Sequence, residues 1–197
     1  MKTTRITNLH GWRLATLLLV APVAVVGQTA QRTAPPSAAA GPVVVVETAR
    51  GTFEFQTYPD DAPKSVEQIL RLVKRNFYNG QRVHRVEPKF VVQWGDPKSR
   101  DMTRRDTWGM APGAGSGKPI GVAEISKTRL HVKGAVGLAH AGDPTQADSQ
   151  IYVMLSDRPA LNGKYAVIGK VVSGMDVVEK LQVEDVVKKM YVKGAAK

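Results

Sequence analysis

Apolar residues recur in short runs along most of this chain, and many runs alternate with polar residues as β-strands do. Val43–Val46 is β-branched, and Thr52–Thr57 alternates around two phenylalanines, with a polar stretch between the two runs. This pattern predicts a β-hairpin. Over Ala62–Arg75 the apolar residues recur at helical intervals instead, and Pro63 suits a first helical turn. The sequence therefore predicts a helix after the hairpin.

Further short strands are predicted along the rest of the chain, each bounded by residues that favour turns. They cover Arg82–Glu87, Phe90–Trp94, Gly134–Ala139, Gln150–Leu155, Tyr165–Val172 and Asp185–Lys193, with a second helix over Met175–Leu181. A polar loop rich in glycine and proline covers residues 96–120. Many short strands with two helices favour a mainly β fold, namely a closed antiparallel β-barrel capped by helices, over residues 42–197.

The first 41 residues follow a different pattern. Three basic residues and no acidic one precede the apolar run Leu14–Gly27, which is too short to span a bilayer comfortably. Residues 1–27 are therefore predicted to be a signal peptide, with an uncleaved signal anchor as the alternative. Residues 28–41, which end in a run of Pro, Ser and Ala and a glycine, predict a flexible linker. We expect an exported, periplasmic protein that contacts the membrane only through such an anchor.

Composition and charge narrow the class of protein. The chain has 197 residues, 43% of them hydrophobic, and no cysteine. This composition excludes a disulfide scaffold, a thiol nucleophile and a thiolate metal site. The net charge of +11 favours anionic partners, but bases and acids are interleaved, as in Lys98–Asp106. We expect no dedicated nucleic-acid binding, and a basic nucleic-acid or membrane-surface protein is the alternative.

Motifs for phosphate, nucleophilic or metal chemistry are missing from the sequence. Gly113–Lys118 resembles a phosphate loop only in part, because Pro112 and Pro119 stand where a glycine and a magnesium-binding hydroxyl are needed. The chain has no Gly-x-Ser-x-Gly elbow and no His-Glu-x-x-His helix, and its histidines lack the spacing of metal ligands. We therefore expect neither a metal nor a cofactor.

An arginine and an amide stand out on two of the predicted strands. Strand alternation places Arg85 on the same face as Val83, and Gln93 on the same face as Val91. If these strands form the wall of a barrel, Arg85 and Gln93 reach a common concave site. Aromatic and aliphatic side chains would then line a pocket beside them.

Three segments resemble the signature blocks of the cyclophilins, in the family's order and spacing. They are Asn76–Gly80 with His84–Val86 and Phe90–Pro97, Gly134–Pro144 with Asp148–Val153, and Leu161–Val178. The resemblance covers about residues 43–192. It implies an eight-stranded barrel closed by two helices that catalyses peptidyl-prolyl cis–trans isomerisation of proline-containing polypeptides without a cofactor.

The resemblance also implies roles for particular residues. Arg85 matches the arginine that stabilises the twisted imide, and Gln93 matches the glutamine that binds the substrate backbone. The proline-ring pocket and its edge match Phe90, Tyr152, Leu161, Val91 and Leu138, and the groove for the preceding residues matches Ala139, His140 and Gln150. Tyr165 stands in place of a family histidine and is expected to contact substrate.

Several positions depart from the family pattern. Val91 replaces a common methionine, and Ile151 and Tyr152 stand where two phenylalanines are usual. Trp94 replaces a glycine and is expected to narrow the edge of the site. Ala160 replaces a tryptophan important for cyclosporin binding, so we expect weak binding of that drug. A peptide-binding chaperone or scaffold with little turnover is the alternative function, and a monomer is expected.

Overall fold

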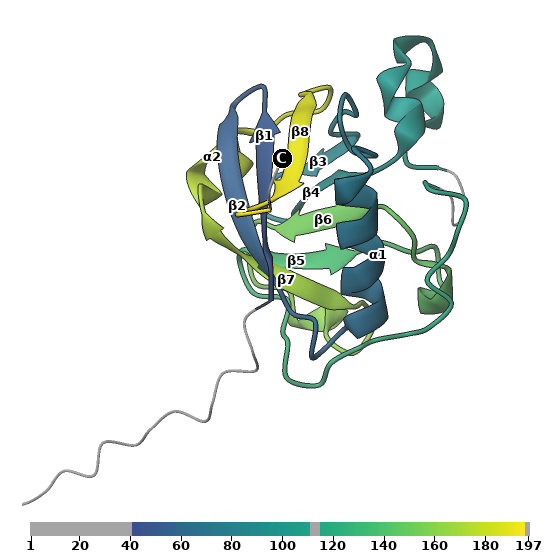
Figure 1. Cartoon of the computed structure of the whole chain (residues 1–197), viewed down its shortest axis with the longest axis vertical. Helices are drawn as coiled ribbons and strands as arrows, with labels where there is room; N and C mark the ends of the chain where they lie inside the picture. The colour runs from purple at the N-terminus through teal and green to yellow at the C-terminus, as the bar shows by residue number, and fades with distance from the viewer. Residues whose placement is uncertain (1–40, 111–114, 196–197) are drawn as a thin grey trace, which may run out of the picture. The chain divides into compact units, whose positions relative to one another are not determined.

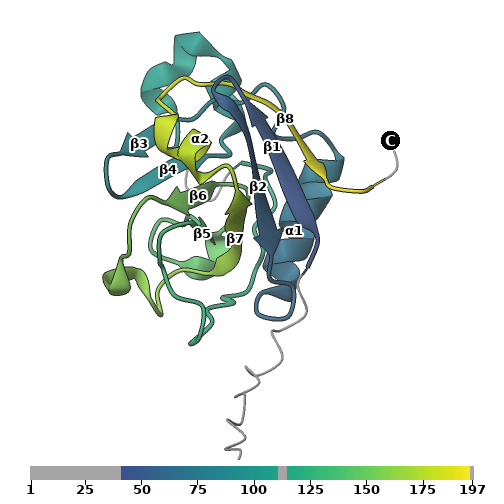
Figure 2. The same ribbon diagram turned by 90° about the vertical axis from the view of Figure 1, so that its left-hand side faces the viewer.

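The fold is built on one sheet of eight antiparallel strands, and the computed structural model describes residues 41–110 and 115–195. The strands are β1 Val43–Thr48, β2 Gly51–Thr57, β3 Arg85–Glu87, β4 Val91–Trp94, β5 Ala135–Leu138, β6 Ile151–Met154, β7 Val167–Ser173 and β8 Val187–Val192. Their order is β3-β4-β6-β5-β7-β2-β1-β8. Figures 1 and 2 show the sheet curling so that β1, β2 and β8 lie opposite β4, β5 and β6.

The sheet is an open half-barrel, so the prediction of a closed barrel is wrong. β3 and β8 stand at the two ends of the strand order. Residues 80–83 and 184–187, at the two ends of the sheet, are joined by the isolated bridge Arg82–Val186 and by a few backbone hydrogen bonds, such as Val83 N–H to the Asp185 carbonyl at 2.9 Å. β3 and β8 themselves are not neighbours in the sheet. β3 has three residues and is followed by Pro88, which has no N–H to extend a ladder. It is therefore too short to pair with β8 along its length.

The predicted hairpin is confirmed, and it supplies much of the core. Val46 pairs with Phe53 and Val44 with Phe55 across β1 and β2, and all four side chains are buried. Inward and outward positions alternate along β2, as the sequence pattern required. The predicted strands over the rest of the chain are likewise present, most of them shortened at one or both ends.

Both predicted helices are present, as α1 Pro63–Lys74 and α2 Met175–Lys180. The apolar face of α1 is buried and packs against β8, whereas α2 packs against β2 (Figure 1). The carboxylate of Glu124 accepts the backbone N–H groups of Lys64 and Ser65 at 2.9 and 2.7 Å. A negative charge at these free N–H groups stabilises the start of the helix, so the segment that carries Glu124 and α1 support each other.

Two buried carboxylates fasten the loop over residues 96–120, which contains the short 3₁₀ helices Pro97–Arg100 and Met102–Thr107. Asp96 accepts the backbone N–H of Gly109 at 2.8 Å, and Asp148 accepts the backbone N–H of Ser116 at 2.8 Å. Gln68 of α1 donates to the same Asp148 at 3.0 Å. Asp96 thereby ties the first half of the loop back to its start, and Asp148 holds the last part of the loop beside α1. Residues 111–114, which include part of the phosphate-loop candidate, lie outside the described residues.

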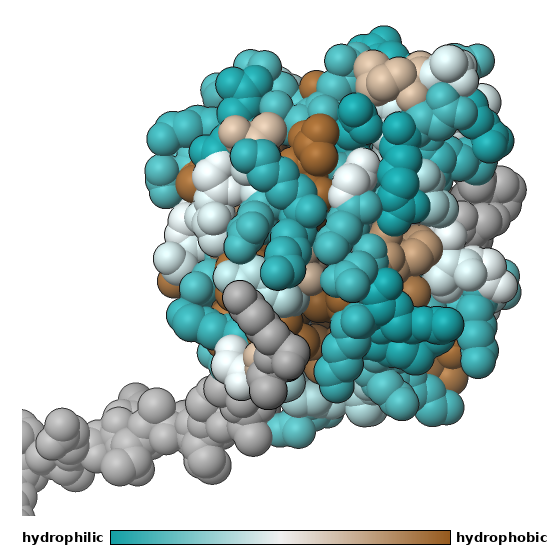
Figure 3. Space-filling view, turned by 45° about the horizontal axis from the view of Figure 1, so that its top comes forward, coloured by the Kyte–Doolittle hydropathy of each residue, from teal (hydrophilic) through white to brown (hydrophobic). Residues whose placement is uncertain are grey.

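The predicted signal sequence and nearly all of the predicted linker also lie outside the described residues. Over residues 41–110 and 115–195, no helix is long and apolar enough to cross a membrane. On the face that Figure 3 shows, polar side chains predominate and apolar ones form small patches between them.

Candidate active site

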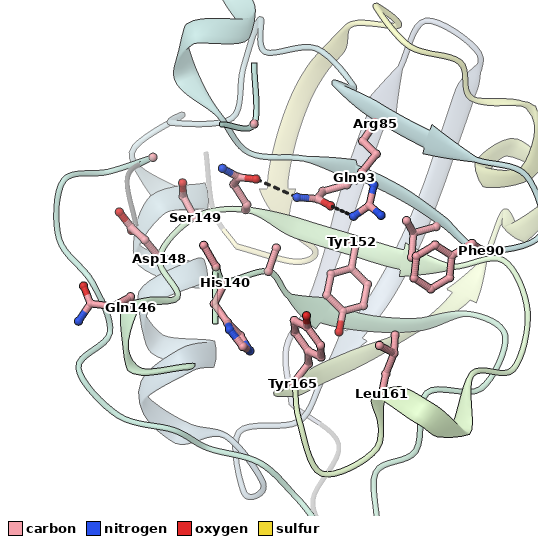
Figure 4. Close-up of a pocket in the computed structure, with 16 residues that line it drawn as sticks. Arg85, Phe90, Gln93, His140, Gln146, Asp148, Ser149, Tyr152, Leu161 and Tyr165 are labelled. Atoms are coloured by element: carbon pink, nitrogen blue, oxygen red, sulfur yellow. Dashed lines mark hydrogen bonds between the residues drawn. The ribbon is translucent and has the colours of Figure 1, made fainter. Parts of the chain in front are cut away.

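A cavity of about 300 Å³ opens beside β3, β4 and β6 and brings together nearly all the residues that the sequence singled out (Figure 4). Of the predicted site residues, those that line it are Arg85, Phe90, Val91, Gln93, Ala139, His140, Gln150, Tyr152, Leu161 and Tyr165. They come from three strands, a 3₁₀ helix and the loops and turns between elements, and these segments are far apart in the sequence. The fold therefore creates the cavity, rather than any single segment.

Two expectations about the site are wrong, and for the same reason. Leu138 does not line the cavity, because it is 1% exposed and packs in the hydrophobic core. Trp94 does not narrow the site edge either, because it is also buried in that core, with its ring edge-on to Phe53. On β4 the neighbouring Gln93 faces the cavity, so alternation turns Trp94 to the opposite face. Leu138 likewise lies on the core face of β5.

The predicted meeting of Arg85 and Gln93 is confirmed. The two residues are direct partners in the β3–β4 register, and Arg85 Nη1 donates to Gln93 Oε1 at 3.2 Å. Gln93 Nε2 in turn donates to Gln150 Oε1 at 2.8 Å (Figure 4). Gln93 is buried while Arg85 is exposed, so the guanidinium lies at the mouth of the cavity and the amide lies deeper. Both groups are thus held in fixed orientations.

A second partner of Arg85 was missed by the sequence analysis. Arg85 Nε donates to Glu87 Oε1 at 2.7 Å, and Nη2 bonds to the same oxygen. The two side chains are 45% and 48% exposed. Residues two apart on a strand share a face, so the alternation that paired Arg85 with Val83 also placed Glu87 beside it. This signal was present in the sequence and was not used.

Aromatic and aliphatic side chains form the wall of the cavity next to the guanidinium. The Arg85 guanidinium lies 5.5 Å from the centroid of the Phe90 ring, within the range of a cation–π contact. Phe90 and Leu161 pack against a buried cluster that includes Val91 and Tyr152 (Figure 4). A ring-sized apolar group bound here would be shielded from water beside a cation.

Tyr165 and His140 close the other side of the cavity. Their rings stack with centroids 4.3 Å apart. The His140 Nε2 lies 3.0 Å from the Lys164 carbonyl oxygen, which can only accept, so Nε2 carries the hydrogen and donates. Tyr165 also meets Tyr152 edge-on at 6.2 Å. The stacked pair therefore continues the aromatic wall of the cavity.

Comparison with known proteins places this geometry in a family. Residues 43–195 match the family model described as cyclophilin type peptidyl-prolyl cis-trans isomerase/CLD. A probable peptidyl-prolyl cis-trans isomerase of Brucella abortus is 42% identical over 139 residues, covering 71% of this chain and 70% of the relative. The Bacillus subtilis peptidyl-prolyl cis-trans isomerase B is 35% identical over 145 residues, covering 72% and 91%.

The chain is a cyclophilin. A crystal structure of a cyclophilin type isomerase from Cryptosporidium parvum has the same fold, with a TM-score of 0.67 at 22% identity, covering 79% of this chain and 99% of that one. The family match and the named relatives make the chain a cyclophilin-type peptidyl-prolyl cis–trans isomerase, as the resemblance predicted. Its substrates are proline-containing peptides.

His84 directly precedes β3 and is not among the residues that line the cavity of this cyclophilin. Burial lowers its pKa from 6.5 to about 4, although the nearby Asp96 carboxylate acts in the opposite direction. A Cβ added to Gly109 would lie 2.8 Å from His84 Cδ2, so the long loop packs tightly on this ring. His84 is therefore neutral near pH 6.5 and above, and its ring packs against the loop over residues 96–120.

Six further residues of the cyclophilin cavity were not predicted: Gly109, Gly115, Ala141, Gln146, Asp148 and Ser149. Gln146 ends the short 3₁₀ helix Pro144–Gln146, and the other five belong to loops, where neither strand alternation nor helical spacing indicates which way a side chain points. Asp148 and Ser149 stand next to Gln150 in the second signature block, so the neighbourhood was visible in the sequence. The contacts that the loop over residues 96–120 makes with the cavity could not be read from the sequence.

Proposed function

We propose that this isomerase accelerates X–Pro rotation in unfolded or loop segments of exported proteins and so assists their folding, with Arg85 acting on the imide. The observation that carries the proposal is the Arg85 guanidinium, hydrogen-bonded to Gln93 at 3.2 Å at the mouth of a cavity with an aromatic wall. A cation beside a ring-sized apolar pocket suits a proline whose imide must be polarised.

The reaction needs no nucleophile, because only a torsion angle changes. The barrier of about 18–20 kcal/mol is the lost amide resonance. At the twisted geometry the proline nitrogen holds a localised lone pair, which accepts a hydrogen bond that the planar imide nitrogen does not. An N–H of Arg85 that donates to this lone pair binds the twisted state better than either planar state, and such differential binding is catalysis.

The hydrogen bonds of Arg85 leave room for this role. A guanidinium has five N–H groups. Three of them donate to Glu87 and Gln93 in the described structure, so two can donate to a substrate. The Glu87 and Gln93 contacts also fix the plane of the group. A preoriented donor needs little reorganisation as the imide twists, which is where electrostatic stabilisation is most effective.

The other cavity residues bind the substrate on either side of the proline nitrogen. Phe90, Tyr152 and Leu161, with Val91 at the edge, take the pyrrolidine ring. Gln93 donates one Nε2 hydrogen to Gln150 and has a second for a substrate carbonyl. In the proposal, Ala139, His140 and Gln150 hold the residues that precede proline, beside Tyr165.

Export is part of the proposal and rests on the sequence. Three basic residues followed by the apolar run Leu14–Gly27 are typical of a signal peptide or signal anchor. The expected location is the periplasm, with a tether to the inner membrane if the leader is retained. Sequencing the N-terminus of the protein recovered from cell fractions tests this, since an unprocessed cytoplasmic chain would contradict it.

The isomerase site is complete within one chain, which supports a monomer. Light scattering of the purified protein tests this expectation, because a stable dimer at micromolar concentration would contradict it.

The test of the function separates catalysis from peptide binding. Exchange NMR measures isomerisation of a short Ala-Pro peptide by the wild type and by Arg85→Ala, and aggregation of an unfolded client is followed in parallel. We expect Arg85→Ala to lose isomerisation while any suppression of aggregation persists. Equal isomerisation by the two proteins would refute the role of Arg85, and suppression of aggregation without turnover by the wild type would favour the chaperone alternative.

A further inference from the structure

A hydrogen-bonded chain of three side chains lies behind the proline pocket. Tyr152, which lines the pocket, is 5% exposed, and its hydroxyl lies 2.8 Å from Nε2 of His131. His131 is itself 1% exposed and is not among the residues that line the cavity. On its other side, Nδ1 of His131 lies 3.2 Å from Oδ1 of Asn162. The chain thus runs from the pocket wall into the protein and ends at a residue next to Leu161.

Donor and acceptor chemistry fixes the direction of each hydrogen bond. Asn162 Oδ1 also accepts the backbone N–H of His131 at 2.8 Å, which identifies that atom as the amide oxygen. A carbonyl oxygen only accepts, so His131 Nδ1 carries the hydrogen. A neutral imidazole has one N–H, so its Nε2 is an acceptor, and the Tyr152 hydroxyl donates to it. Burial lowers the pKa of His131 below its ordinary value, which favours this neutral form.

The space for the Tyr152 hydroxyl is also specific. A Cβ added to Gly137 would lie 2.4 Å from both Cζ and Oη of Tyr152. Gly137 is on β5, directly opposite Tyr152 in the β5–β6 register. Its φ is not positive, so the backbone does not require glycine there. The glycine instead makes room for the ring and its hydroxyl, which then reaches His131.

The same chain ties two walls of the pocket together. Tyr152 belongs to β6, whereas Leu161 ends the 3₁₀ helix Pro159–Leu161 and directly precedes Asn162. The side chain of His131 lies between these elements. It bonds to Tyr152 through Nε2 and to Asn162 through Nδ1. Tyr152 and His131 are buried and Asn162 is half-buried, and both ring nitrogens of His131 are hydrogen-bonded. A polar network of this kind favours one arrangement of its members.

We propose that His131 is a positioning residue of the isomerase site: by accepting the Tyr152 hydroxyl hydrogen and donating to Asn162, it fixes the Tyr152 and Leu161 walls around the proline ring. The inference rests on the proposed role of Tyr152 and Leu161 in binding that ring. It assigns to His131 an effect on catalysis without contact with the substrate, and it explains why a histidine, a tyrosine and a glycine occur together in this chain.

A double-mutant cycle tests the proposal. In His131→Leu the buried hydroxyl has no acceptor, so Tyr152 must shift, and kcat/KM for an Ala-Pro peptide is expected to fall about tenfold, equivalent to about 1.4 kcal/mol. Tyr152→Phe leaves Nε2 unpaired and lowers kcat/KM as well. Because the double variant removes both partners, it is expected to be several-fold more active than His131→Leu alone. A double variant no more active than His131→Leu, or strictly additive effects, would overturn the proposal.

A matched control separates positioning from a general loss of stability. Thr57 is buried outside the cavity, and its hydroxyl donates to the Pro42 carbonyl at 2.8 Å. Thr57→Val therefore removes one buried hydrogen bond as well. It is expected to lower the urea midpoint while kcat/KM is unchanged, whereas His131→Leu lowers both. A fall in the midpoint alone for His131→Leu would show that His131 only stabilises the fold.

The wild type gives a test that does not depend on the variants folding. Nitrogen-15 NMR of the full chain reports which ring nitrogen of His131 is protonated. We expect the Nδ1–H form, together with a Tyr152 hydroxyl proton that exchanges slowly with water. An Nε2–H form would overturn the inference. A wild type that shows this signature but no isomerisation would refute the proposed function instead, so the two failures are distinguishable.

Discussion

Acid is expected to unfold this protein partly through His84. The pKa of His84 is lowered from 6.5 to about 4 by burial, whereas in the unfolded chain it returns to about 6.5. The unfolded state therefore binds a proton that the native state does not. Stability from this residue is complete above pH 6.5 and is lost as the pH falls toward 4. Since one pKa unit corresponds to about 1.4 kcal/mol, the free energy of unfolding falls by about 3 kcal/mol over this range.

Urea unfolding followed by tryptophan fluorescence, at several pH values from 6.5 down to about 4, measures this loss. His84→Gln is the matched chain, because it keeps a polar group at the position but does not titrate. Other groups, including His131 with its lowered pKa, are common to both chains and cancel in the comparison. We expect the wild type to lose about 3 kcal/mol more than the variant. An equal loss of the free energy of unfolding in the wild type and in His84→Gln would refute the assignment of the acid sensitivity to His84.

Three further substitutions test other parts of the account. Glu87→Gln frees one edge of Arg85 and is expected to lower kcat/KM about threefold. The free energy of unfolding is expected to change by less than about 1 kcal/mol, because the ion pair is exposed. An unchanged or higher kcat/KM would contradict this expectation. Gly137→Ala places a Cβ 2.4 Å from the Tyr152 ring, and urea unfolding is expected to show a loss of about 1–3 kcal/mol; a neutral effect would contradict the packing. Ala160→Trp is expected to strengthen inhibition by cyclosporin in the exchange assay, and an unchanged inhibition curve would contradict the family comparison.

Strand alternation alone predicts the orientation of more site residues than were assigned from it. It brought Arg85 and Gln93 to one face, and the structure pairs them directly. The same alternation places Trp94 opposite Gln93 and therefore in the core, where it lies. The wrong expectation for Trp94 came from comparing it with a family glycine instead. Periodicity within a strand reports the face of a side chain directly, whereas a family comparison reports only which residue is usual there.

Other features depend on contacts that no local pattern contains. The register that sets Arg85 against Gln93 is made by a turn in which Lys89 has a φ of 58°, a conformation for which lysine gives no signal. A closed barrel would require β3 and β8 to pair, and these strands are about one hundred residues apart in the sequence. In the described residues the two ends of the sheet are joined instead through residues 80–83 and 184–187, around the Arg82–Val186 bridge. The His131–Tyr152 contact joins a loop to a strand. Such long-range pairings follow from packing of the whole fold.

In the proposed function, Arg85 binds the twisted imide better than the planar one. The direct measurement compares kcat/KM with the dissociation constant of an Ala-Pro peptide in the wild type and Arg85→Ala, both by NMR. We expect kcat/KM to fall by about a hundredfold or more, equivalent to about 2.7 kcal/mol, while the dissociation constant changes by less than about threefold. A loss of peptide affinity as large as the loss of kcat/KM would contradict it, because Arg85 would then bind the ground state and the twisted state equally.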